Sequence, residues 1–119
     1  MDCDYDFHAG LAMTEELLRL YPDVDGILAC NDVVALSIYK ILHRRNISVP
    51  EQVQLIGFDD ISWSSLFTPA LTTVSQPIEQ MAQRATELIM NHKDTDEKGV
   101  EIVYPVQLTV RETTRKGRN

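Results

Sequence analysis

The chain has 119 residues, of which 44% are hydrophobic and 24% charged, a composition typical of one globular domain. Its formal net charge of −7 argues against a surface that grips nucleic acid, because such surfaces need clustered Lys and Arg. No apolar run approaches the roughly 18 residues that a membrane span needs, and the acidic N-terminus has no signal-peptide core, so we expect a cytoplasmic protein with no membrane partner.

Two helices and a strand are predicted in the N-terminal part of the chain. Hydrophobic residues at helical spacing predict a helix over residues 9–20, and the apolar run at residues 26–30 predicts a strand. A second helix is expected over residues 33–45, with Asp32 as its N-cap. Cys30 ends the strand, and we expect it to be buried as a small hydrophobic residue.

The middle of the chain predicts two further strands. Residues 53–58 and residues 71–74 are rich in apolar and β-branched side chains. Strands that alternate with helices are typical of a parallel sheet with right-handed crossovers. We therefore predict an α/β fold, with a parallel sheet and helices on both faces in three layers. Two crossover helices cannot easily cover both faces, so the chain is expected to be part of a larger domain.

A third helix and two short strands are predicted in the C-terminal part. Residues 78–91 carry the apolar stripe of an amphipathic helix, and Pro77 suits its first position. Residues 101–104 and residues 106–112 predict two short strands separated by a proline. Because the helix has no sheet of its own within the chain, we expect its apolar stripe to leave the isolated chain prone to self-association.

Three consecutive predicted strands each lead into a polar side chain that could bind a ligand. Asn31 follows the first strand, Asp59 the second and Gln76 the third. In an open parallel sheet, ligands bind outside the carboxyl ends of the strands. Carboxylate and amide groups can hydrogen-bond the hydroxyls of a sugar. The alternatives are that Asn31 only marks a helix start and that Asp59 caps the turn over residues 61–66.

The sequence gives little support to catalysis or to a bound metal. The three histidines are scattered, without Cys or carboxylate partners at the spacing of metal ligands. Nucleotide-binding glycine motifs and the nucleophile elbow of hydrolases are missing. Asp59 and Asp60 could form an acid/base pair, although adjacent carboxylates in a loop are usually solvated. We predict no enzyme activity, no catalytic residues, no metal and no cofactor.

Four segments of the chain share the pattern of one protein family: ACNDVVALSIYKIL, SVPEQVQLIGFDD, TPALTTVSQP and LTVRETTR. In this order and spacing they resemble the lactose repressor/galactose repressor family of bacterial transcription regulators. The resemblance runs from about Tyr5 to Arg115. It implies the second half of an effector-binding domain with the two-lobed fold of periplasmic binding proteins. The DNA-binding helix-turn-helix and the first half of that domain would lie outside the chain.

The resemblance also implies roles for the polar residues at the strand ends. Asp59 matches a family residue that contacts the effector, and Asn31 and Gln76 fall on ligand positions. Tyr5 matches an aromatic position that stacks on the flat face of a sugar or base, a role for which Phe7 could compete. The expected effector is a sugar or sugar phosphate, although the family also includes regulators that respond to purines, nucleosides or a phosphocarrier protein.

A homodimer is the other partner that the resemblance implies. Leu36 and Phe67 fall on interface positions of the family, and Trp63 adds aromatic surface beside Phe67. Aromatic residues are enriched in protein interfaces. The alternative is that the helix containing Leu36 is simply buried on two sides, which is the commoner case.

The family architecture assigns residues 1–75 and 106–115 to the C-terminal lobe and residues 76–104 to the other lobe. The predicted function is a ligand-responsive transcriptional repressor, with operator DNA bound only through a domain outside this chain. The alternative is a periplasmic sugar-binding protein of the same fold, and a more distant one is an enzyme that uses the two adjacent aspartates.

Overall fold

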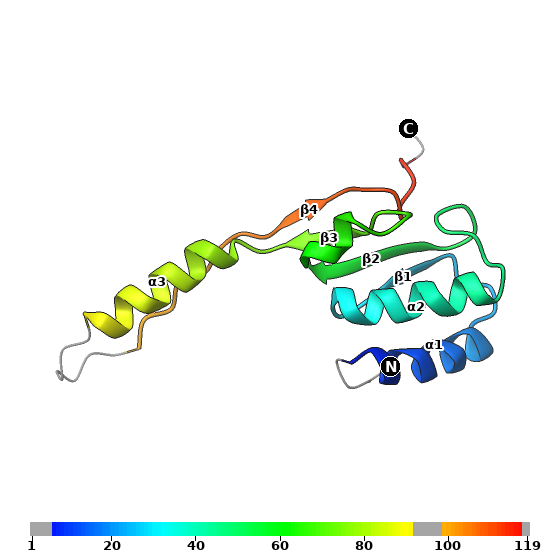
Figure 1. Ribbon diagram of the computed structural model, residues 1–119, viewed down its shortest axis with the longest axis horizontal. Coiled ribbons are helices and arrows are strands. Elements are labelled where there is room, and N and C mark those ends of the chain that lie inside the picture. Colours follow the sequence, from blue (N-terminus) through cyan, green and yellow to red (C-terminus); the bar gives the residue numbers. More distant parts are fainter. Residues whose placement is uncertain (1–5, 92–98, 118–119) are drawn as a thin grey trace.

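A four-stranded mixed sheet in the order β1-β2-β3-β4 forms the centre of the computed structural model, which describes residues 6–91 and 99–117 (Figure 1). The first three strands are parallel, and β4 runs antiparallel to β3. The strands are β1 (Gly26–Leu28), β2 (Gln54–Asp59), β3 (Thr72–Ser75) and β4 (Gln107–Thr109). The predicted α/β class is confirmed, whereas the antiparallel strand was not foreseen.

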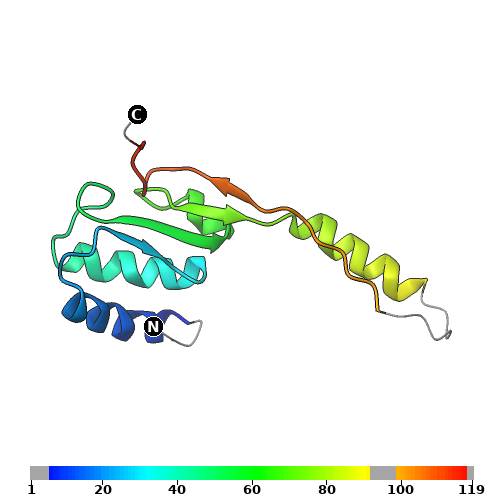
Figure 2. The ribbon, with the colours of Figure 1, turned by 180° about the vertical axis from the view of Figure 1, so that it is seen from behind.

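Helices α1 (Phe7–Leu20) and α2 (Asp32–Arg44) pack side by side on the same side of the sheet (Figures 1 and 2). Their apolar stripes meet the sheet in one core, whose burial from water is the main stabilising contribution. The core residues are Leu18, Ala29, Val34, Ala35, Ile38, Ile41, Leu42, Val53, Leu55 and Leu71. The described residues therefore supply the helical layer of one face, and Leu28 on the opposite face of the edge strand β1 is 72% exposed.

The ends of the first elements differ from the expected ones by a few residues. Helix α1 begins at Phe7 because the carboxylate of Asp6 accepts a hydrogen bond from the Ala9 N–H at 2.7 Å. Strand β1 ends at Leu28, so Cys30 lies beyond it and is exposed, contrary to our prediction of a buried cysteine.

Helix α3 (Ile78–Met90) and the segment that returns from it form an arm (Figure 1). The arm projects from the sheet and its two helices α1 and α2, which we call the body. The molecule accordingly measures 58 × 32 × 26 Å. Pro77 is the N-cap of α3 and not its first residue. The predicted strand over residues 101–104 does not form, because this segment runs along α3 and has no strand beside it. Side chains of both lie around a hollow lined by Met81, Arg84, Ala85, Leu88, Val100, Ile102 and Tyr104.

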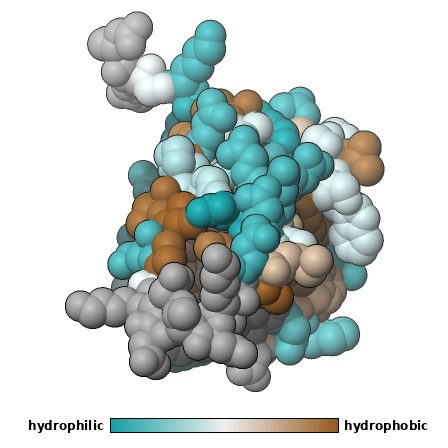
Figure 3. Space-filling model, turned by 90° about the vertical axis from the view of Figure 1, so that its left-hand side faces the viewer, coloured by the Kyte–Doolittle hydropathy of each residue, from teal (hydrophilic) through white to brown (hydrophobic). Residues whose placement is uncertain are grey.

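The arm exposes much of its apolar surface, as the view from its tip shows (Figure 3). All thirteen residues of α3 are exposed, including Ile89 and Met90 at 76% and 78%. On the returning segment, Val103 is 81% exposed. The expectation that the amphipathic stripe lacks a complete partner within the chain agrees with these exposures.

Candidate functional site

Because β1, β2 and β3 run parallel, their carboxyl ends lie at the same edge of the sheet, the one next to the arm (Figure 1). We call it the carboxyl edge. Asp59 is the last residue of β2, Gln76 follows β3 directly, and Asn31 follows β1 as the N-cap of α2. Parallel pairing between neighbouring strands makes this arrangement a consequence of the topology. The three polar side chains singled out in the sequence therefore belong to one edge.

Asp59 and Gln76 form a direct pair at the junction of body and arm. The amide nitrogen of Gln76 donates a hydrogen bond to Asp59 Oδ1 at 2.7 Å, and both residues are half-buried. Beside them is an open hollow of about 400 Å³, lined by Asp59, Asp60, Gln76, Pro77, Ile78, Glu79 and Gln80. The pair offers donor and acceptor atoms to a small polar molecule in this hollow.

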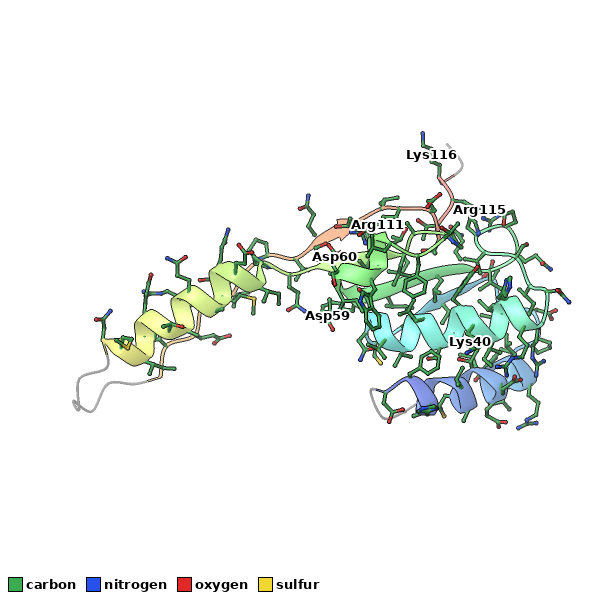
Figure 4. The ribbon with its side chains drawn as sticks, viewed as in Figure 1. Lys40, Asp59, Asp60, Arg111, Arg115 and Lys116 are labelled. Atoms are coloured by element: carbon green, nitrogen blue, oxygen red, sulfur yellow. The ribbon has the colours of Figure 1, made fainter. Side chains whose placement is uncertain are left out.

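Asp60 is not a solvated partner of Asp59 but part of a separate ion pair (Figure 4). Its carboxylate accepts hydrogen bonds from Arg111 Nη2 at 2.7 Å and from the Ser75 hydroxyl at 2.8 Å. Desolvation is the largest single influence and raises the pKa of Asp60, but the hydrogen bonds from Arg111 and Ser75 and the charge of Arg111 together hold it below its usual value. Asp60 is therefore charged at neutral pH. Its carboxylate is bonded to Arg111 and Ser75 and does not form an acid/base pair with Asp59.

This ion pair makes a testable contribution to pH-dependent stability. A carboxylate with a lowered pKa in the folded state stabilises the fold above its unfolded pKa, and this stabilisation is lost as pH falls through the folded value. We expect Asp60→Asn to lower the free energy of unfolding by about 1–2 kcal/mol at pH 7. The difference from the wild type should shrink below about pH 4. Urea unfolding of both proteins at pH 7 and pH 3 measures it, and an equal difference at both values would contradict the assignment.

The residue that caps α2 differs from the one predicted for the helix start. Asn31 is the N-cap of α2, and its Oδ1 accepts a hydrogen bond from the Val34 N–H at 2.8 Å. Asp32 lies in the first turn and is fully buried. The prediction that Asp32 caps the helix was wrong, because its carboxylate is used by groups from other elements.

Three donors converge on the buried carboxylate of Asp32. It accepts hydrogen bonds from the Ile61 N–H at 2.9 Å, the Ser64 hydroxyl at 2.5 Å and the Thr73 hydroxyl at 2.6 Å. The Ile61 N–H is thus bonded to Asp32, which argues against the alternative that Asp59 caps this turn. Asp32 links the start of α2 to β3 and to the 3-10 turn η1 (Ser62–Ser65). The sequence gives no signal for this role, because Asp32 resembles an N-cap and its partners are distant in the chain.

The predicted aromatic contact cannot be placed, since Tyr5 lies outside the described residues. Phe7, its competitor, is the first residue of α1 and is half-buried. The Lys40 ammonium lies 5.6 Å from the centre of the Phe7 ring, within the range of a cation–π contact. This contact ties Phe7 to α2.

The three predicted interface residues retain accessible surface in the chain. Trp63 and Phe67 are 58% and 40% exposed, and Leu36 is half-buried. The Tyr39 hydroxyl donates to the Thr68 carbonyl at 3.3 Å, which holds the segment after η1 against α2. Trp63 and Phe67 therefore present apolar surface to solvent, whereas Leu36 is partly buried within the fold.

The described part of the chain contains neither a cluster of metal-binding side chains nor a membrane-spanning helix. Among these residues, no group of three or more His, Cys, Asp or Glu side chains could hold a metal ion. None of the described helices combines the length and the apolar character that crossing a membrane requires.

The family described as periplasmic binding protein-like domain matches residues 3–114. The chain belongs to this family. The ribose operon repressor of Halalkalibacterium halodurans is 40% identical over 96% of this chain and 35% of its own length. The ribose operon repressor of Bacillus subtilis is 39% identical over 88% of this chain and 32% of its own length. The chain thus spans about a third of the length of these relatives, and the resemblance to the lactose/galactose repressor family is confirmed.

Solved structures of regulators have the same fold as this domain. A LacI-family transcriptional regulator from Burkhoderia phymatum superimposes with a TM-score of 0.85 at 28% identity, covering 98% of this chain and 42% of that one. A LacI-family regulator from Enterococcus faecium, solved with bound ribose, gives a TM-score of 0.83 at 31% identity, covering 94% of this chain and 41% of that one. The relatives are named as transcriptional regulators and not as enzymes.

Proposed function

We propose that this chain belongs to the effector-binding part of a sugar-responsive transcriptional repressor. The observation that carries the proposal is the Asp59–Gln76 pair beside an open hollow at the carboxyl edge of the sheet. Asn31 at the same edge is the third proposed ligand residue, and Tyr5 the proposed stacking residue. The ribose operon repressors among the relatives support this function over a periplasmic sugar-binding protein.

The charges around the hollow favour an uncharged sugar over a phosphorylated one. Asp59 and Glu79 line the hollow with carboxylates, which would repel a phosphate group. The guanidinium of Arg111 is already bonded to Asp60 and to the Leu71 carbonyl. Carboxylates and amides suit sugar hydroxyls, because they bond neutral donors and acceptors without a counter-charge. Because two relatives are named ribose operon repressors, ribose is the first uncharged sugar to test.

The body and the arm are the proposed parts of the two lobes. Residues 1–75 and 106–115 would belong to one lobe, and residues 76–104 to the other, with the ligand held at their junction. Ligand binding would favour a closed arrangement of the lobes and shift the population of DNA-binding states. We propose further that Leu36, Trp63 and Phe67 contribute to a homodimer, and that a separate domain of the complete protein binds operator DNA.

A titration of the complete protein tests the proposed function. Calorimetry with ribose, cellobiose, lactose and ribose 5-phosphate should reveal saturable binding of an unphosphorylated sugar. The same sugar should change the retardation of the protein's own promoter DNA in a gel, and it should be recovered chemically unchanged. If no sugar in a broad panel bound, the proposed function would be wrong.

The residue expected to matter most for affinity is Asp59. Asp59→Ala removes charge-assisted hydrogen bonds to sugar hydroxyls, each of which contributes on the order of 1.5–3 kcal/mol. We expect sugar affinity to fall tenfold or more while the unfolding midpoint changes little. Asp25→Ala, at an exposed position before β1, is the matched control. Unchanged calorimetric affinity in Asp59→Ala would remove this residue from the site.

A further inference from the structure

Two successive residues at the end of β2 have backbone conformations that L-amino acids rarely adopt. The φ angles are 110° at Asp59 and 55° at Asp60. Positive φ costs free energy for any residue with a Cβ atom, and such conformations persist only when surrounding contacts hold them. The carboxylate proposed to bind the ligand therefore projects from a backbone that needs support.

Hydrogen bonds to the side chain and the backbone N–H of Asp60 provide this support. Ser75 at the end of β3 donates to one carboxylate oxygen at 2.8 Å, and Arg111 donates to the other at 2.7 Å. The Asp60 N–H faces the Thr73 hydroxyl at 3.4 Å. The Asp60 and Arg111 side chains are only 27% and 18% exposed, so solvent screens their attraction less than that of a surface pair.

Arg111 is itself fixed at two further points. Its Nη1 donates to the Leu71 carbonyl at 2.9 Å, and its backbone N–H donates to the Thr72 hydroxyl at 2.9 Å. The side chain can bond the Asp60 carboxylate and the Leu71 carbonyl together because its guanidinium is a planar fork with several donors. Arg111 follows β4, on the segment that returns from the arm, so it fastens that segment to the end of β2 and the start of β3 (Figure 4).

We propose that Arg111 is a positioning residue for the sugar site. By holding Asp60 it maintains the left-handed backbone at the end of β2, and this backbone keeps the Asp59 carboxylate paired with Gln76 and directed to the hollow. The inference rests on the proposed function, and it adds a residue that lies outside the lining of the hollow. Its consequence is that sugar affinity depends on a side chain that never contacts the sugar.

Ribose affinity of the complete protein tests this role. Arg111→Met should raise the Kd for ribose about tenfold, and Arg111→Lys, which keeps the charge but not the fork, should restore part of the loss. Arg115→Met is the matched control, since Arg115 is exposed and lies farther along the same segment (Figure 4), and it should leave the Kd unchanged. Asp60→Asn, a nearly isosteric variant, should weaken ribose binding to a similar degree. It replaces Arg111→Met in the test if Arg111→Met fails to fold.

A double-variant cycle separates positioning from general destabilisation. If Arg111 acts through the Asp59 carboxylate, adding Arg111→Met to Asp59→Ala should change the Kd by less than twofold. An equal loss in both backgrounds, or wild-type affinity in both Asp60→Asn and Arg111→Met, would overturn the inference while sugar binding by the wild type still supports the proposed function. Failure of the wild type to bind any sugar would overturn both.

Discussion

Asp32→Ala is expected to destabilise the domain by about 3 kcal/mol or more. The substitution removes an acceptor shared by the Ile61 N–H and by the hydroxyls of Ser64 and Thr73. The two hydroxyl-bearing residues are almost fully buried, at 1% and 0% exposure. Each buried donor left without a partner costs about 1–3 kcal/mol. Urea unfolding followed by circular dichroism measures the loss.

Two variants make the Asp32 result specific. Asp23→Ala removes an exposed carboxylate from the turn after α1 and should change the free energy of unfolding by less than about 0.5 kcal/mol. Asp32→Asn keeps one acceptor oxygen and should fall between the wild type and Asp32→Ala. If Asp32→Ala were as stable as Asp23→Ala, the three hydrogen bonds would not contribute to stability.

Gly57→Ala is the second substitution expected to have a large effect, because the buried carboxylate packs directly on this glycine. A Cβ atom at position 57 would lie 2.1 Å from Asp32 Oδ1 and 3.0 Å from Leu71 Cδ2. The first distance is far below van der Waals contact, so the carboxylate or strand β2 must shift. Overpacking of a buried site costs about 1–3 kcal/mol, and displacement of Asp32 from its donors adds to this. We expect a loss of at least about 2 kcal/mol.

Strand β1 provides the control for this glycine. Gly26 begins β1, and a Cβ atom there would meet nothing within 4 Å. Gly26→Ala should therefore leave stability unchanged or raise it slightly, since alanine restricts the unfolded chain more than glycine does. Equal stability of Gly57→Ala and Gly26→Ala, measured by urea unfolding, would contradict the close packing of Asp32 on β2.

Asp32 also connects the stability of the body to the proposed ligand site. The Thr73 hydroxyl that donates to Asp32 faces the N–H of Asp60 at 3.4 Å. Asp60 in turn is bonded to Arg111 and precedes the segment that leads into η1. Hydrogen bonds thus extend from the start of α2, through β3 and the backbone N–H of Asp60, to the segment returning from the arm. The residues proposed to contact sugar lie beside this network.

The sequence by itself determined the features that depend on local pattern. Helical spacing of apolar residues identified α1, α2 and α3 to within about two residues at each end, because a helix must turn one stripe toward its neighbours. Apolar runs identified the parallel strands, and the polar residues after each run predicted that Asn31, Asp59 and Gln76 share one edge. The four family segments also indicated the regulator family without any knowledge of contacts.

The tertiary structure decided everything that depends on partners distant in the chain. The bonds of Asp32 to Ile61, Ser64 and Thr73 span 29, 32 and 41 residues, and the Arg111–Asp60 pair spans 51. No local pattern encodes such pairs, so Asp32 resembled an N-cap and nothing in the sequence singled out Arg111. The same limit explains β4, whose antiparallel direction is set by the return of the chain from the arm to the edge of β3. Side chains at strand ends can be identified from sequence, but the residues that hold them in place are defined only when the chain has folded.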